Sequence, residues 1–144
     1  MNAIEAIQKA WGWVGIEPEE IVSENDFGNL IIRDVLGRYW RLCPEDVYCI
    51  IVAHDQEAFN TLSREQAFLE DWHMSALVET AKDQFGDLLL GRKYHLSIPA
   101  VLGGAYDASN IRTVSHIEQI LFSGDIGRKI KSLPDGSQIQ LTVL

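Results

Sequence analysis

A predicted β-hairpin at residues 28–46, GNLIIRDVLGRYWRLCPED, constrains the fold more than any other part of the chain. Two runs rich in β-branched and aromatic residues, 29–34 and 38–42, flank a turn at DVLG. Pro44 has no backbone N–H and is therefore expected to close the second strand. The apolar side chains expected to share one face of the hairpin are Leu30, Ile32, Trp40 and Leu42.

Three further segments are predicted as strands. Residues 46–55, DVYCIIVAHD, form a short apolar run bounded by acids, and we expect this strand to be more buried than the hairpin. Residues 92–102, RKYHLSIPAVL, alternate apolar and polar side chains over their first half. Residues 137–144, SQIQLTVL, alternate throughout, which is the pattern of a half-buried strand.

Helical periodicity predicts the other regular elements. Residues 3–13 have the spacing of an amphipathic helix. Residues 56–86 are helical in composition, but their apolar positions fit either one helix that is apolar on two sides or two helices separated near residue 71. Residues 116–134 carry two apolar stripes whose phase changes at 123–124, which predicts a helix, a kink and a second helix.

Together these elements predict an α+β fold, with a mostly antiparallel sheet of about five strands and helices packed on one face. The acidic stretch between the first helix and the hairpin, GIEPEEIVSEND at 15–26, is expected to be an irregular connection. A chain of 144 residues fits a single domain, here taken as 1–144.

The chain is acidic, with 21 Asp and Glu against 12 Lys and Arg and a net charge of −9. This balance argues against a nucleic-acid ligand, because phosphates repel such a surface. It suits a basic protein partner, although acidity for solubility alone would give the same balance. The chain has no run of the roughly 18 apolar residues that a membrane helix needs, and its first residues are not typical of a secretory signal. We therefore expect no membrane partner and a cytoplasmic location.

The sequence contains no recognisable cofactor or metal motif. Cys43 and Cys49 lie in strand-like sequence and are expected to be reduced thiols. The four histidines have no metal-ligand spacing relative to one another or to the cysteines. We therefore expect no cofactor and no bound metal.

One stretch allows an enzymatic hypothesis. In FLEDWHM, Asp71 could orient His73 as a general base of a small hydrolase. However, no serine or cysteine lies in a nucleophile motif such as G-x-S-x-G. The alternative is a helix start whose acids favour the positive end of the helix dipole and whose Trp72 packs in the core.

Two glycine pairs suggest phosphate contacts only superficially. LGGAY, residues 102–106, lacks the lysine and spacing of a P-loop, so its glycines predict a turn with positive φ. Asp107 and Asn110 after it are expected to bind nearby backbone amides. SGDIGRK, residues 123–129, has the G-x-x-G spacing of nucleic-acid-binding KH loops, but its helical context and the net charge disfavour that function.

Four segments in this order, FGNLIIRDVLGRYWRLCPED, FLEDWHMSALVETAKDQFG, SIPAVLGGAYDASNI and SGDIGRKIKSLPDG, resemble the Tdi-type domain of bacterial type VI secretion immunity proteins. The resemblance extends from about Trp11 to the C-terminus. Its most distinctive part is P-x-x-L-G-G-x-Y-x-x-x-N, here Pro99, Leu102, Gly103, Gly104, Tyr106 and Asn110. The resemblance implies a non-enzymatic cytoplasmic protein that binds a cognate toxin, typically a DNase, and neutralises it.

Two regions are expected to contact this partner. The first is the acidic run, because its charges cluster: Glu17, Glu19, Glu20, Glu24 and Asp26. The second is the loop after Gly104, which presents polar and aromatic groups at a turn: Tyr106, Asp107 and Asn110. A cytosolic adaptor or regulator of the same fold, outside toxin systems, is the alternative function.

Overall fold

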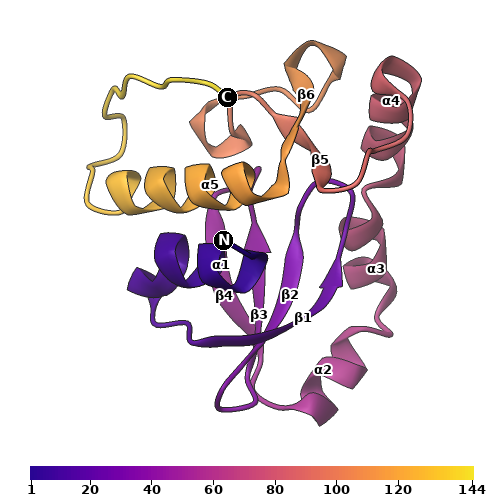
Figure 1. Ribbon diagram of the computed structural model, residues 1–144, viewed down its shortest axis with the longest axis vertical. Helices are drawn as coiled ribbons and strands as arrows, with labels where there is room; N and C mark the ends of the chain where they lie inside the picture. The colour runs from indigo at the N-terminus through magenta and orange to yellow at the C-terminus, as the bar shows by residue number, and fades with distance from the viewer.

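The computed structural model describes residues 1–144, which form two antiparallel sheets and five α-helices (Figure 1). The strands are β1 Pro18–Glu24, β2 Leu30–Asp34, β3 Tyr39–Cys43, β4 Tyr48–Ala53, β5 Arg92–Leu96 and β6 Ile111–Ser115. The helices are α1 Ala3–Trp11, α2 Gln56–Leu62, α3 Gln66–His73, α4 Ser75–Phe85 and α5 His116–Ile130. The predicted α+β class is confirmed. None of the helices is both long and apolar enough to cross a bilayer.

The first sheet has the order β1-β2-β3-β4, and the predicted hairpin forms its centre. Leu30 lies opposite Leu42 and Ile32 opposite Trp40, so these four side chains share one face as expected. Asp34 fixes the hairpin turn, because its buried carboxylate accepts hydrogen bonds from four donors: Leu36 N, Arg38 N, Arg38 Nε and Trp40 Nε1.

Helices α1 and α5 cover that face of the sheet and enclose the main core (Figure 1). Two glycines within α5 allow the helices to approach closely. A Cβ at Gly124 would lie 2.4 Å from the carbonyl oxygen of Ala10, and one at Gly127 would meet the ring of Trp11 at 2.9 Å. The G-x-x-G pattern is therefore a helix-packing feature. Helix α5 is continuous, so the predicted kink and second helix are wrong.

The opposite face of the sheet is also covered, which corrects the expectation of helices on one face only. Ile31 and Tyr39 point to this side and pack with Trp72 of α3, and Phe59 of α2 stacks on Tyr39 with 4.6 Å between ring centroids. Figure 1 shows the helices α2, α3 and α4 following one another along this side of the molecule. The burial predicted for Trp72 is confirmed.

The segment 56–86 contains separate helices, so the two-helix alternative for its second half is confirmed. The break lies at Met74, whose φ of +48° and ψ of +41° place it in the left-handed region and stop helical hydrogen bonding. Helix α4 begins directly after it and packs Ala81 on Tyr94, in a smaller core beside the β5–β6 sheet. Gly86 ends α4 with a positive φ.

Several strand predictions need correction. The acidic stretch 15–26 contains β1, an edge strand whose two register shifts disturb the alternation that would have revealed it. The strand at 46–55 exists as β4 but is less buried than the hairpin strands, because it lies at a sheet edge. The strand predicted at 92–102 ends at Leu96, and β6 was not predicted. Residues 137–144 form no strand and pair with none, although Leu141 packs on the main core.

Candidate functional site

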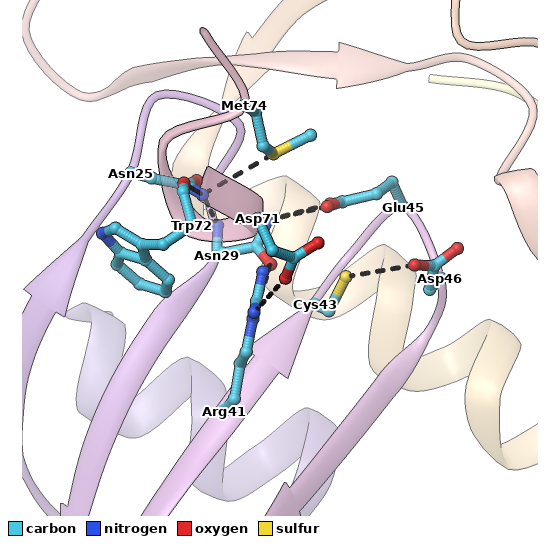
Figure 2. Close-up of polar contacts among 9 residues, drawn as sticks. All are labelled: Asn25, Asn29, Arg41, Cys43, Glu45, Asp46, Asp71, Trp72 and Met74. Carbon is cyan, nitrogen blue, oxygen red and sulfur yellow. Dashed lines mark hydrogen bonds and ion pairs between the residues drawn. The ribbon is translucent and has the colours of Figure 1, made fainter. Parts of the chain in front are cut away.

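A buried polar network connects the sheet to helix α3 at the end of the sheet opposite the hairpin turn (Figure 2). Asn29 lies at its centre and is fully buried. Its Nδ2 donates to both carboxylate oxygens of Glu45 at 2.9 Å, and its Oδ1 accepts from Nη2 and Nε of Arg41 at 3.0 and 3.2 Å. One amide therefore joins an acid and a base that make no direct ion pair with each other.

Arg41 lies in the middle of β3, and its side chain is only 7% exposed. Its Nη1 donates to Oδ2 of Asp71 at 2.5 Å, and its guanidinium lies 5.3 Å from the ring centroid of Trp72. Asp71 and Trp72 are neighbours on α3, so Arg41 contacts two consecutive residues of that helix. This arrangement fixes α3 on the sheet and holds the Asp71 carboxylate at the surface.

Asn25 extends the network to the end of α3. Its Oδ1 accepts from the backbone N–H groups of Phe27 and Asn29, which shapes the β1–β2 turn. Its Nδ2 donates to the carbonyl oxygen of Trp72 at 2.8 Å and contacts Sδ of Met74. A side chain from the turn therefore satisfies a carbonyl group at the end of α3.

Glu45 has a buried carboxylate. The one side-chain nitrogen that donates a hydrogen bond to it is the neutral amide of Asn29. Glu45 is only 6% exposed, and this burial raises the pKa of its carboxyl group. Burial likewise raises the pKa of the neighbouring Cys43 thiol far above its usual range, so this thiol is protonated and unreactive at neutral pH.

A cleft of about 470 Å³ opens beside this network, and we call it the β3–β4 cleft. Arg41, Cys43 and Tyr48 line it from the sheet, and the residues on either side of Met74 line it from α3 and α4. Four acids border it: Glu45, Asp46, Glu70 and Asp71. Arg41 is the only basic residue in its lining, and it is already bound to Asp71.

A second cleft of about 720 Å³ lies on the other side of the α3–α4 junction, and we call it the α4 cleft. Its acids are Glu24, Asp26, Glu79 and Asp83, and Lys82 is its one lysine. Glu24 forms an ion pair with the buried Lys93, whose Nζ lies 2.8 Å from Oε1, and the hydrogen bond from this lysine is the main reason that the pKa of Glu24 is lowered.

The loop at 97–110 forms one wall of the β3–β4 cleft, and its motif residues hold it in place. Asn110 is buried and binds both backbone groups of Ile98 at 2.9 Å and the carbonyl oxygen of Ala105 at 3.0 Å. Gly103 has the predicted positive φ of +94°, whereas Gly104 is needed for space, since a Cβ there would overlap the carbonyl oxygen of Ile98 at 1.7 Å. The loop is thus a structural turn with a shape set by its glycines and Asn110.

Tyr106 and Asp107 take different roles in this loop. The hydroxyl group of Tyr106 donates to Oδ1 of Asp46 at 2.9 Å, so the half-exposed ring lies at the cleft. Asp107 accepts from the backbone N–H of Ser109, which confirms the predicted turn contact. Of the three loop residues expected to contact a partner, Tyr106 lines a cleft and Asp107 is exposed, while Asn110 is buried.

The acidic run 17–26 is not one patch. Glu17, Glu19 and Glu20 lie at the hairpin end of β1, where Arg33 forms ion pairs with Glu19 and Glu20. Glu24 and Asp26 lie at the other end and line the α4 cleft. Strand formation therefore divides the five acids between the two ends of the sheet.

The two residues considered as a hydrolytic pair, Asp71 and His73, also lie in different clefts. Asp71 faces Arg41 and lines the β3–β4 cleft, whereas His73 lines the α4 cleft. No group of three or more His, Cys, Asp or Glu side chains is arranged to hold a metal ion.

Sequence reasoning missed the central members of the network, Asn29, Arg41 and Glu45. A signal was present, because Arg41 interrupts the apolar run of the predicted strand at 38–42. A buried arginine requires hydrogen-bond acceptors or an acid nearby. The sequence does not show which residues these are, because they depend on how α3 packs on the sheet.

Comparison with known protein families gives one result. Residues 53–127 match the family described as type VI secretion system (T6SS) immunity protein Tdi1, C-terminal. No curated protein matches the chain. The matched segment includes α3 and α4, whose residues line both clefts, and the loop at 97–110, whose Tyr106 lines the β3–β4 cleft. Since this match covers 75 of the 144 residues, the chain belongs to the C-terminal domain family of the T6SS immunity protein Tdi1.

Proposed function

We propose that this protein binds a cognate toxin delivered by type VI secretion and neutralises it by direct contact in the cytoplasm. The family match carries this proposal, because immunity proteins protect cells from such toxins. The match includes α3 and α4, which form the helical side of both clefts, while the sheet side lies outside the matched residues.

The charge of the surface supports a basic partner, and we propose that the toxin is a nuclease. Each cleft has four acids, and only one lysine or arginine lines it. An enzyme that binds DNA needs a positive surface to contact phosphates, so the two surfaces would attract each other. Opposite potentials mainly speed association and fix the orientation of a complex.

We further propose that neutralisation needs no catalysis by this chain. The carboxylate of Asp71 is engaged by Arg41, so it does not orient His73 as a base. The thiol of Cys43 is buried and protonated, and it offers no nucleophile. Inhibition would therefore follow from occupying or covering the toxin surface.

The test is calorimetric titration of the purified chain with the toxin domain encoded beside its gene, at low and high salt. We expect a Kd in the nanomolar range, as in other specific protein complexes, and weaker binding at high salt. A parallel assay would follow DNA cleavage by the toxin with increasing immunity protein, and cleavage should stop at equal molar amounts. Absence of binding between two folded proteins would contradict the proposal and favour an adaptor function.

A further inference from the structure

The β3–β4 cleft lies beside the part of the sheet that α3 covers, and Glu70 and Asp71 of α3 belong to its lining. Helices α2 and α3 pack on Ile31, Tyr39 and Ala53, and of these Tyr39 and Ala53 pair with each other at the hairpin end of the sheet. Next to the cleft, Ile50 of β4 pairs with Arg41 and remains 51% exposed. Ile50 therefore adds one exposed apolar side chain to the sheet surface beside the cleft.

The lining of the cleft combines apolar and acidic groups. Half of its twelve lining residues are hydrophobic, and they include the rings of Tyr48 and Tyr106. Its four acids face a single arginine whose nitrogens are already bound to Asn29 and Asp71. Aromatic rings beside carboxylates suit a guanidinium group, which stacks on a ring and donates to an acid in its own plane.

Glu45 provides a second observation that points to a cation. Glu45 lines the cleft, is more than nine-tenths buried, and takes part in none of the ion pairs of the structure. Its hydrogen bonds come from neutral groups, chiefly the amide of Asn29, so no positive charge of the chain pairs with it. Burial raises its pKa, and an approaching cation would favour the ionised form.

The walls of the cleft are held in place before any partner arrives. The Asn29 network fixes Glu45 and Asp71, and the hydroxyl group of Tyr106 is bound to Asp46. The backbone N–H of Ala100 donates to the carbonyl oxygen of Glu45 at 2.7 Å, which joins the loop at 97–110 to the β3–β4 turn. A preformed cleft loses little conformational entropy when it binds.

We propose that the β3–β4 cleft receives an arginine side chain from the toxin, and that this contact anchors the complex. The proposal rests on the toxin-binding function proposed above and assigns that binding to one surface and one chemistry. The cleft volume of about 470 Å³ lies in the range of sites that enclose small molecules, so it has room for a long side chain and its neighbours.

The experiment measures toxin binding kinetics for matched charge variants of the full chain. The cleft variant is Asp46→Asn with Glu70→Gln. The control is Glu19→Gln with Glu20→Gln, which changes the net charge equally at the hairpin end of β1. We expect the cleft variant to raise Kd about 30-fold or more, mainly through faster dissociation, as when a buried charge pair loses one partner. The control should change Kd by less than about 5-fold, mainly through association at low salt.

A second variant tests the volume of the cleft independently of the network. Ala76 is exposed on α4 and lines the cleft, so Ala76→Arg should leave the fold intact while placing a cation in the cleft. We expect this variant to lose measurable toxin binding, with an unchanged circular dichroism spectrum and melting temperature. Equal effects of cleft and control variants, or full binding by Ala76→Arg, would overturn this inference and leave the proposed function standing. Failure of the unmodified chain to bind the toxin would overturn both.

Discussion

Nη1 of Arg41 lies 2.5 Å from Oδ2 of Asp71, and this contact joins strand β3 to helix α3 across 30 positions of sequence. The two ends of the pair differ in environment, with side-chain exposures of 7% and 68%. A buried guanidinium thus faces an acid that water also reaches. The pair orients α3 and keeps a negative charge at the rim of the β3–β4 cleft.

Replacement of Asn29 by alanine should destabilise the fold by about 2–4 kcal/mol. The change removes the donor to Glu45 and an acceptor of Arg41, and both charged groups stay buried. The free energy of unfolding should be measured by urea titration. The exposed Asn60 on α2 is a suitable control, since Asn60→Ala should alter stability by no more than about 0.5 kcal/mol. Similar values for both variants would show that the network contributes little.

Replacement of Gly124 by alanine should also destabilise the protein, by about 1–3 kcal/mol, although alanine is the better helix former. The added methyl group would overlap Ala10 and force α1 away from α5. Thermal unfolding would measure the effect as a lower Tm. Arg128→Ala, on the exposed side of the same helix, is the matched control and should leave Tm nearly unchanged. A higher Tm for Gly124→Ala would show that the two helices can move apart at no cost.

Stability should decrease as pH falls between about 6.5 and 4, in part because of His95. Burial lowers the pKa of His95 to about 4 in the folded chain, with a smaller contribution from the nearby Arg112, whereas the unfolded chain binds the proton near pH 6.5. The unfolded state therefore holds more protons in this window, and stability is lost as pH falls through it. The difference of about 2.5 pKa units corresponds to about 3 kcal/mol.

Urea titrations at several pH values would measure this dependence, and the same series on His95→Gln would isolate the histidine. The variant should show a shallower decrease across the window. A direct check is NMR titration of the His95 ring, which should stay neutral until the pH approaches 4. Protonation near pH 6 would contradict the buried environment of the ring.

The amide hydrogens of residues 138–144 should exchange with solvent at rates close to those of an unfolded peptide. None of these residues donates a backbone hydrogen bond, and most are exposed. Hydrogen exchange followed by mass spectrometry would measure this, with the central strand β2 as the protected reference. Strong protection of the tail would show that it pairs as a strand after all.

Local patterns were enough to predict the hairpin, the first helix and the α+β class. The hairpin was predictable because Leu30, Ile32, Trp40 and Leu42 alternate regularly and the turn lies between them. The tail shows the limit of this reasoning. Residues 137–144 have the alternation of a strand, but a strand also needs a hydrogen-bonded partner, and these residues pair with no strand of either sheet.

The elements that were missed depend on tertiary structure. Strand β1 is bulged, so its side chains do not alternate regularly between the faces of the sheet. The kink predicted near Gly124 rested on a phase change between two apolar stripes. Both stripes lie on one continuous helix, because α1 crosses α5 closely and α5 therefore buries a broad face. The resemblance to an immunity family indicated the kind of partner. Neither cleft could be located from sequence, since each combines residues far apart in the chain.

The contact between Ala10 and Gly124 also affects how the protein is made in the cell. Helix α1 leaves the ribosome before α5, and part of the surface that buries it belongs to α5, more than a hundred residues later. Until α5 has been synthesised, the side of α1 that faces α5 has no native partner, although the sheet that α1 also covers is already present. The main core closes only after α5 has emerged, so folding is delayed until late in translation.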